Sequence, residues 1–522
     1  KDSEIIKHYH DSVEFFFDNM LLNCNIRDTL KNIIDLERIV SKLGLNTINP
    51  KEIYYLKLSL NKIFDVHKYI QDQQAIPTYL KTLLDKIQNK LPDVLKIVNK
   101  INEYLRDDPP TEVGFGYVIK TGVSKDLDNF IELKNNSKEY LLKIQQIEIE
   151  KTGIASLKIG FNQVFGYYLE VTKSNLNKVP PYYIRKQTLA NVERFITPEL
   201  KELEEKILSV DIQIKELEQK LFDNLCKFLL QYIDTVMYLA DIISELDLIT
   251  NFAFIAKEND YVKPIIHSRM NMIENGRHPV IEKLQKEYVP NNTNFTKPIH
   301  IITGPNMAGK STYIRAVCLI YIMAQIGSFV PATKFVFTPV DNVFSRIGAA
   351  DNLSKGESTF MVEMIETANI LNNATRNSLI ILDEIGRGTS TYDGVAIAWS
   401  IIEYICNNLQ TKTLFATHYH ELTNLEKKFS ELVENYHVKV ANLDNKNIKF
   451  LYKLDRGFTN KSYGIYVAKM AGIPELVIKR AEEILSLFEK NNNVSNVTKN
   501  DIVKDVIDIK PKKVDVEQLT LM

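Results

Sequence analysis

A lysine and a serine follow a glycine-rich turn near the middle of the chain, and this arrangement is the strongest sign of chemistry in the sequence. Residues 304–311 have the spacing G-x-x-x-x-G-K-S and follow the apolar run 299–303. Backbone N–H groups of such a loop hold phosphate oxygens, and the dipole of the following helix adds positive potential. Lys310 would reach the β- and γ-phosphates, and the Ser311 hydroxyl would ligate Mg²⁺. The residues expected to contact the nucleotide here are Gly304, Pro305, Asn306, Met307, Ala308, Gly309, Lys310, Ser311 and Thr312.

Two carboxylates end a second apolar run. Residues 378–382 are SLIIL, followed by Asp383 and Glu384. Such a run predicts a buried parallel strand, and open α/β sheets bind ligands at the carboxyl ends of their strands. We expect Asp383 to ligate Mg²⁺ and Glu384 to orient and activate the attacking water. Without the phosphate loop, an ordinary strand that exits into solvent would be the better interpretation.

A histidine and two glycine-rich segments complete the predicted site. His418 follows the expected strand 413–417 and could contact the γ-phosphate or the attacking water, so the predicted catalytic set is Glu384, His418 and Lys310. Segments 353–364 and 386–394 are polar and glycine-rich. Taken alone they read as surface loops, but together they suit a site that a second copy of the domain closes.

Four motifs in this order connect the chain to a known family. The runs GPNMAGKST, LSKGESTFMVEM, ILDEIGRGTSTYDG and FATHYHEL resemble the ATPase domain of the MutS family of DNA mismatch-repair proteins, in its bacterial type. Upstream, DLERI at 35–39 resembles the core domain of that family. FGYYLEVTK at 165–173 and IRKQTL at 184–189 resemble its DNA clamp.

The resemblance implies a set of ligands and partners. ATP and ADP would bind with Mg²⁺ at composite sites of a dimer, either a homodimer or a heterodimer of paralogues. Tyr288 and Tyr452 would flank the adenine, and Ser358 of the other subunit would reach the γ-phosphate. Double-stranded DNA and a downstream protein of the MutL type are the further partners that the family implies.

Charge places any DNA contact in a local patch. The 522 residues carry a formal net charge of −1, so the chain as a whole is not basic. Segment 171–188 has no acidic residue and contains Lys173, Lys178, Arg185 and Lys186. Phosphates bind such charge whatever the base sequence. Charge alone does not distinguish a solvated loop from a DNA contact, and the resemblance favours the DNA contact.

Composition agrees with a large soluble intracellular protein, and the expected localisation is cytoplasmic, with nucleoid association if the protein is bacterial. The length suggests about three or four domains. Cys24, Cys226, Cys318 and Cys406 form no C-x-x-C pair and are expected to be thiols in a reducing compartment. The sequence contains no signal peptide and no apolar stretch long enough to span a bilayer, so no membrane partner is expected.

Glycine and proline positions predict the organisation. Residues 1–108 hold one glycine and should be helical, with breaks near Gly44–Pro50, Pro77 and Pro92, whereas 199–263 hold neither residue type and should form long helices. With the resemblance added, the predicted fold class is a multidomain α plus α/β protein, with a long helical core and lever, an inserted β-rich clamp, a P-loop ATPase of the ABC type and a C-terminal helix-turn-helix. The expected domains are a helical core and lever (1–138), a clamp (139–197), returning lever helices (198–262), the ATPase (263–457), a helix-turn-helix (458–490) and a flexible tail (491–522). A helix-turn-helix usually reads the major groove of DNA, but the resemblance implies that this one serves dimerisation.

Both ends of the chain carry expectations. The sequence begins at Lys1, as expected of a piece of a longer protein, and it lacks a recognisable N-terminal mismatch-reading domain. Phe130-Ile131-Glu132 has the Phe-x-Glu spacing of the family's reader but lies in the wrong region. Alone, the chain should therefore bind DNA with little mismatch preference. At the other end, Gln518–Met522 resembles the short peptides that dock on sliding clamps, although a frayed tail is the alternative.

Two other function classes fit the sequence less well. A transporter or chromosome-organising ATPase would require an L-S-G-G-Q signature where this chain has Ser354–Met364. A non-enzymatic DNA scaffold would tolerate a degenerate site, whereas Lys310, Ser311, Asp383 and Glu384 are all intact. The sequence therefore favours an ATP-driven mismatch-repair clamp.

Overall fold

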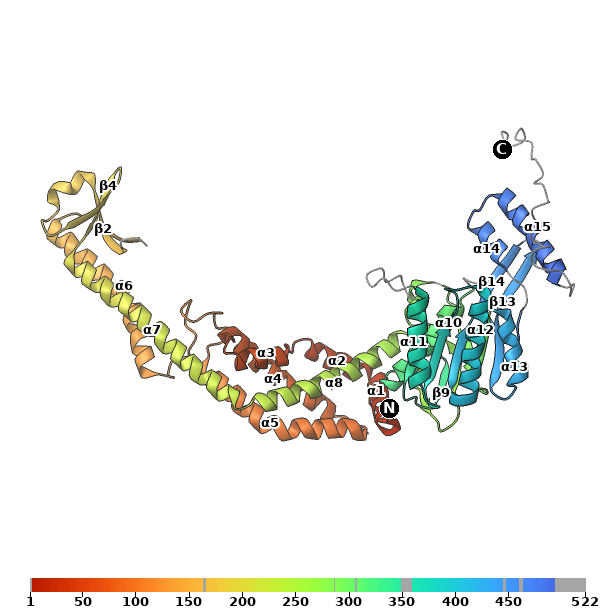
Figure 1. Cartoon of the computed structure of the whole chain (residues 1–522). Coiled ribbons are helices and arrows are strands. Elements are labelled where there is room, and N and C mark those ends of the chain that lie inside the picture. Colours follow the sequence, from red (N-terminus) through yellow and green to blue (C-terminus); the bar gives the residue numbers. More distant parts are fainter. Residues whose placement is uncertain are drawn as a thin grey trace, which may run out of the picture. The chain divides into compact units, whose positions relative to one another are not determined.

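The computed structural model describes residues 2–162, 166–285, 287–305, 308–348, 359–444, 447–459 and 463–492. The chain divides into two compact units (Figure 1). One unit is Phe15–Phe254, and the other combines Lys1–Glu14 with Ile255–Met522. This mixed α and α/β organisation confirms the predicted fold class at that level. None of the helices in the described part of the chain combines the length and apolar character needed to cross a bilayer.

The Phe15–Phe254 unit is mostly helical. Its helices are α1 (Ser3–Asp18), α2 (Met20–Leu30), α3 (Leu36–Gly44), α4 (Pro50–Gln71), α5 (Thr78–Tyr104), α6 (Lys125–Thr152), α7 (Pro198–Leu230) and α8 (Ile233–Glu258). Helices α1 and α8 extend beyond the limits of this unit. Helix α4 starts at a capping box in which Asn49 and Glu52 each accept from the other's backbone N–H. The predicted breaks near Gly44–Pro50 and Pro77 are confirmed, and so are the long helices after residue 198.

The predicted break near Pro92 is wrong, because α5 continues through this residue. Proline removes one backbone hydrogen bond and disfavours the helix interior. Here Leu84, Ile87, Val94 and Ile97 are buried at helical spacing on both sides of Pro92. Burial of this apolar face outweighs the local cost of the proline, as tertiary packing often does.

A small antiparallel sheet lies between α6 and α7 in the sequence. Its strands are β1 (Lys158–Asn162), β2 (Gly166–Thr172), β3 (Ile184–Thr188) and β4 (Val192–Ile196), in the order β1-β2-β4-β3, with the 3-10 helix η1 (Lys173–Lys178) after β2. Leu169, Val171 and Phe195 form its core with Leu200 of α7 and Ile149 of α6. The sheet therefore sits at the end of the paired helices α6 and α7, as Figure 1 shows. The expected clamp boundary at residues 138 and 139 falls inside α6.

The second unit is built on a six-stranded sheet. Its order is β10 (Val343–Arg346), β11 (Leu379–Asp383), β12 (Lys412–Ala416), β8 (Ile299–Thr303), β13 (Val433–Asp444) and β14 (Asn447–Arg456). Neighbouring strands are parallel except for the last pair, β13 and β14. A second sheet has the order β5 (Ile265–Ile266), β9 (Lys334–Phe337), β6 (Met272–Gly276) and β7 (Asn291–Asn294). The three predicted strands of the nucleotide site thus exist as β8, β11 and β12, each within a residue of its expected bounds.

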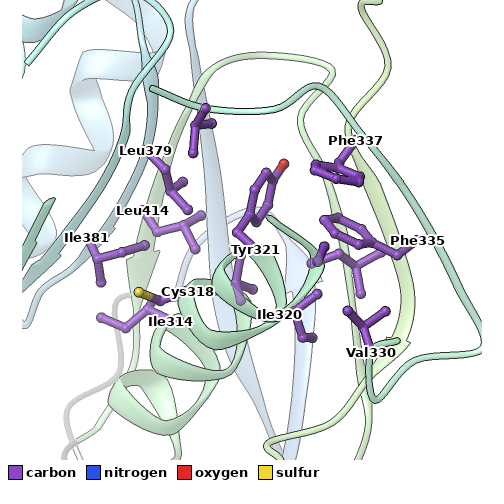
Figure 2. Close-up of a cluster of buried hydrophobic side chains, with 14 of the residues drawn as sticks. Ile314, Cys318, Ile320, Tyr321, Val330, Phe335, Phe337, Leu379, Ile381 and Leu414 are labelled. Carbon is purple, nitrogen blue, oxygen red and sulfur yellow. The ribbon is translucent and has the colours of Figure 1, made fainter. Parts of the chain in front are cut away.

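Both faces of the six-stranded sheet are buried. On β11, Leu379 and Ile381 face one apolar cluster, and Ile380 and Leu382 face the other. The first cluster includes residues of α10 (Lys310–Gln325) and is drawn in Figure 2, where Leu379, Ile381 and Leu414 lie opposite Tyr321. The second includes residues of α11 (Thr359–Asn373) and α12 (Thr391–Tyr404). This two-sided burial explains why these strands read as continuous apolar runs.

The remaining elements are short or C-terminal. They are α9 (Ile281–Leu284), the π-helix η3 (Ile405–Leu409), the 3-10 helix η4 (His420–Asn424), α13 (Leu425–Lys428), α14 (Gly464–Met470) and α15 (Glu475–Asn492). Gly472, with φ +84°, lies in the turn between α14 and α15, and α15 begins directly after Pro474. Gly472 and Pro474 therefore occupy the positions that their helix-stopping and helix-starting roles predict.

Candidate nucleotide-binding site

Strand register brings the three predicted motifs to one edge of the sheet. Asp383 at the end of β11 pairs with Ala416 of β12, and Ala416 pairs with Ile302 of β8. The segments that follow these strands therefore leave the sheet side by side. They carry the glycine-rich loop after Thr303, then Glu384, then His418.

The phosphate loop places Lys310 at the start of a helix. Gly304 and Gly309 have φ values of +144° and +92°, which favour glycine, and α10 begins at Lys310. The Lys310 Nζ is buried and donates to the carbonyl oxygens of Gly304 (2.6 Å) and Pro305 (3.0 Å). Burial lowers the pKa of Lys310, and Glu384 and Asp383 oppose this shift. The ammonium group is thus fixed beside the loop that would hold the phosphates.

Ser311 and Asp383, the two predicted Mg²⁺ ligands, contact each other. The Ser311 Oγ donates to the Asp383 Oδ1 at 3.0 Å, and the Asp383 carboxylate is buried. Burial raises the pKa of Asp383, while Ser311, Arg315 and Lys310 act against the rise. A hydroxyl and a carboxylate are hard oxygen ligands, and a buried carboxylate whose charge is not fully compensated fits a divalent cation.

Glu384 is held in an unusual backbone conformation. Its φ is +51°, and its N–H donates to the Ala416 carbonyl at 2.9 Å. The carboxylate accepts from Arg387 Nη1 at 2.9 Å and lies 3.9 Å from Lys310 Nζ. A left-handed conformation of a residue other than glycine costs on the order of 1 kcal/mol and occurs often at functional sites. The strain fits a residue that must present its carboxylate at one place.

His418 lies at the exposed side of the same edge. Partial desolvation lowers the pKa of its imidazole, and Lys310 and Arg387 lower it further, whereas Glu384 raises it. The neutral ring is therefore the dominant form near pH 7, since the pKa lies below its ordinary value. A neutral imidazole can both donate and accept a hydrogen bond, which suits contact with a water or a phosphate oxygen.

The two predicted adenine-contacting tyrosines reach the same cavity as the phosphate loop. A cavity of about 820 Å³ is lined by Tyr288, Tyr452, Gly309, Lys310, Ser311, Thr312, Glu384 and Arg387, among others. Burial raises the pKa of Tyr288. A Cβ atom on Gly309 would lie 3.2 Å from the Tyr452 ring, so the loop and this ring are in close approach. One cavity thus offers aromatic surface at one part and phosphate-binding groups at another.

Two residues of this site were missed at the level of sequence. Asn291 donates to the Tyr452 carbonyl (2.9 Å) and accepts from the Leu454 N–H (2.8 Å), which fixes Tyr452 at a φ of +53°. No motif pointed to Asn291. Arg387 pairs with Glu384, and its place in the glycine-rich segment 386–394 was the only available signal.

The predicted DNA-contacting residues lie in the other unit. Lys173 and Lys178 are the first and last residues of η1, and Arg185 and Lys186 lie on β3. All four side chains are exposed. Arg185 is also 3.1 Å from the Glu193 carboxylate, an ion pair that the acid-free segment did not reveal.

Several predicted residues fall outside the described part of the chain. These are Phe165 of the clamp motif, Asn306 and Met307 of the phosphate loop, Ser358, and the C-terminal Gln518–Met522. Their predicted roles are neither supported nor opposed by the structure.

Comparison with known proteins gives two family matches and many relatives. Residues 300–489 match the model for MutS domain V, and residues 122–212 match that for MutS family domain IV. The chain is 49% identical over 504 residues to a DNA mismatch repair protein MutS of Clostridium botulinum (strain 657 / Type Ba4), covering 94% of this chain and 53% of that protein. It is 48% identical over 496 residues to the protein of the same name from Clostridium perfringens (strain ATCC 13124), covering 93% and 54%. The chain thus spans about half the length of the curated relatives it matches.

Proposed function

The chain belongs to the MutS family, and on that premise we propose that it is the DNA-clamping and ATP-hydrolysing portion of a DNA mismatch repair protein. The cavity that combines Lys310, Ser311 and Glu384 with Tyr288 and Tyr452 is the observation that carries this proposal. It offers stacking surface for a base and polar groups for a triphosphate within one volume. ATP is the proposed substrate, and ADP and phosphate are the products.

In this proposal each residue has a separate task. Lys310 and the backbone N–H groups of the glycine-rich loop, which Pro305 lacks, would bind the phosphates, and Ser311 and Asp383 would hold Mg²⁺. Bound Mg²⁺ would supply positive charge that stabilises the transferring phosphoryl group. Glu384 accepts a hydrogen bond from the attacking water and orients it, and neutral His418 contacts the water or the γ-phosphate. Most of the gain would come from positioning and charge, as in other phosphoryl transfers.

The first test of this function is ATP hydrolysis by the full chain, with and without duplex DNA. Lys310→Met should weaken nucleotide binding, because the ammonium group that contacts the phosphates is lost. Binding can be followed with a fluorescent ATP analogue, and turnover by phosphate release. Equal binding and turnover in the parent and the Lys310 variant would contradict the proposal.

The complete site is proposed to require two chains, in a homodimer or a heterodimer of paralogues. Ser358 of one chain reaches the γ-phosphate bound by the other, and α14 and α15 supply a dimerisation element. Exposed apolar residues of these helices and their turn support this role: Met470, Ile473, Leu476 and Val477. ATP would thus favour the closed dimer through its higher affinity for that state.

Mixing two inactive variants tests the composite site. Ser358→Ala and Lys310→Met would each damage one half of a site. In a mixed dimer both defects can fall on the same site and leave the other intact, so mixing should restore activity. Mixed dimers that form but recover no hydrolysis would place Ser358 outside the partner's site.

Double-stranded DNA is the proposed ligand of the β1–β4 sheet and η1. Lys173, Lys178, Arg185 and Lys186 would bind phosphates without reading bases. A MutL-type protein is the proposed downstream partner. Gln518–Met522 is the proposed peptide that docks on the sliding clamp. The proposed location of the protein is the cytoplasm, near the nucleoid. Binding of a peptide spanning residues 514–522 to the cognate clamp, with Gln518→Ala and Leu521→Ala as controls, tests the last assignment.

A further inference from the structure

A buried acid outside the nucleotide cavity contacts the loop that follows Glu384. Glu363 lies on α11, is 5% exposed, and is not among the residues that line the cavity. Its Oε1 accepts a hydrogen bond from the Gly386 N–H at 2.5 Å. Its Oε2 lies 3.5 Å from the guanidinium of Arg346 on β10, which is also buried. A hydrogen bond to a charged acceptor in such a site is among the stronger kinds.

Gly386 is anchored through both its N–H and its carbonyl, which belong to the two peptide groups on either side of its Cα. Its carbonyl accepts from the Tyr419 hydroxyl at 2.9 Å, and Tyr419 is the residue after His418. The φ of Gly386 is +88°, and a Cβ atom there would lie 2.7 Å from Gly394. Neither rotation about the backbone bonds of Gly386 nor addition of a side chain there is therefore tolerated without movement of its neighbours.

Helix α11 touches the same loop at a second point. A Cβ atom on Gly388 would lie 2.9 Å from the Cβ atom of Phe360. Between Gly386 and Gly388 stands Arg387, which pairs with the Glu384 carboxylate. The position of α11 thus fixes the chain on both sides of Arg387, and Gly386 is two residues from Glu384.

We propose that Glu363 is a positioning residue for hydrolysis, which acts through the Gly386 N–H to keep Glu384 aligned with the attacking water. The inference rests on the ATPase function proposed above. Glu384 already has a strained backbone, so its carboxylate stays in place only if the surrounding peptides are held. Small misplacement of a reacting group is costly to the rate and need not change substrate affinity.

The chain offers a matched control for the charge of Glu363. Glu366 lies on the same helix and contacts the same Arg346, with 3.1 Å between its Oε2 and Nε, but its side chain is 46% exposed. It has no hydrogen bond to Gly386 among the described contacts. Glu366→Gln therefore removes one negative charge beside Arg346 without touching the loop.

The experiment compares Glu363→Ala, Glu363→Gln and Glu366→Gln in the full chain. Steady-state hydrolysis gives kcat and KM, a fluorescent ATP analogue gives affinity, and thermal unfolding gives Tm. Glu363→Ala should lower kcat on the order of tenfold or more with a nearly unchanged KM, because only the alignment of Glu384 is lost. Glu363→Gln should recover part of this loss, since its amide oxygen can still accept from Gly386. Glu366→Gln should match the parent.

A purely structural role for Glu363 predicts different results. If pairing with Arg346 were its only task, Gln would be as damaging as Ala, and the loss would appear in Tm while kcat of the folded fraction stayed at the parent value. Either result would overturn the proposal. Should Glu363→Ala fail to fold, Tyr419→Phe releases the Gly386 carbonyl and must lower kcat without raising KM.

Failure of this inference can be separated from failure of the function. A parent chain that hydrolyses no more ATP than Lys310→Met would contradict the ATPase function itself. A parent whose hydrolysis depends on Glu384, combined with a Glu363→Ala variant of parental kcat, would contradict only the role of Glu363.

Discussion

The charged residues of the nucleotide cavity and those of the β1–β4 sheet differ in how tightly the fold holds them. Lys310 and Asp383 are 4% and 7% exposed; Lys310 donates hydrogen bonds of 2.6 and 3.0 Å, and Asp383 accepts one of 3.0 Å from Ser311. Lys173, Lys178 and Lys186 are exposed at a surface. Cleavage of one bond needs atoms at fixed positions, whereas a uniform phosphate backbone binds any nearby positive charge. The tight hold on the first set suits its proposed role in ATP hydrolysis, and the exposure of the second suits its proposed role in DNA binding.

Burial of an acid does not by itself mark a catalytic group. Glu148 of α6 is fully buried, and its Oε2 accepts from the hydroxyls of Tyr182 and Tyr183, at 2.9 Å each. Lys151 pairs with its Oε1 at 3.0 Å. Its oxygens are thus satisfied, and it ties the segment before β3 to α6. Asp383 instead lies beside groups that face a cavity, so a ligand bound there would interact with its buried carboxylate.

The largest effect is expected from Glu384→Gln. Glutamine keeps the size of the side chain but cannot take a proton, so hydrolysis should slow by roughly 100-fold or more. ATP affinity should stay within about threefold of the parent, because Lys310, which contacts the phosphates, and Ser311, which would hold Mg²⁺, are unchanged. Single-turnover hydrolysis and equilibrium binding measure the two quantities. Parental turnover would show that the buried site is not organised around Glu384.

The exposed region should show its full effect when its four basic residues are changed together. Replacing Lys173, Lys178, Arg185 and Lys186 with Ala should weaken binding to matched and mismatched duplexes equally, by roughly 10- to 100-fold at low salt. The slope of log affinity against log salt should fall by roughly 3 to 4, or about 0.9 for each lost phosphate contact. Fluorescence anisotropy over a salt series provides the slope. If the slope is unchanged, the segment does not contact DNA.

A smaller effect is expected in the pH profile of hydrolysis. Burial raises the pKa of Asp383, so this carboxylate is protonated, and lost as a Mg²⁺ ligand, at higher pH than an ordinary aspartate. Activity should fall on the acid side as pH drops through this raised pKa. Since metal and proton compete for the carboxylate, more Mg²⁺ should move the acid limb to lower pH. If the acid limb does not move with Mg²⁺ concentration, the titrating group behind it is not Asp383.

The smallest effect should separate two basic residues of the exposed region. Lys178→Ala should reduce the salt slope by about 0.9. Arg185→Ala should reduce it by less, because Glu193 already neutralises part of its charge at 3.1 Å. The same anisotropy series compares them, with Glu193→Gln as the control that should strengthen DNA binding. An equal loss for both residues would mean that the Glu193 pair opens when DNA binds.

The sequence by itself determined the local elements of the site. The strand, glycine loop and helix around Lys310 follow from an apolar run and two glycines that can adopt positive φ. The ends of β11 and β12 were placed within a residue by their apolar runs. Such features depend on neighbours only a few positions away, which a sequence pattern records directly.

Only the tertiary structure decided the contacts between distant segments. No spacing rule predicts these contacts, since each depends on how separate elements pack. They are the hydrogen bonds of Asn291 with Tyr452 and of Glu363 with Gly386, and the ion pair of Glu193 with Arg185. Pro92 shows that packing can also override a local signal. Proline disfavours a helix interior, but the buried apolar neighbours on α5 keep the helix continuous. Backbone preferences differ by about 1 to 3 kcal/mol per residue, and burial of several apolar side chains exceeds that. Local chemistry therefore fixed which groups could react, and packing fixed where they are held.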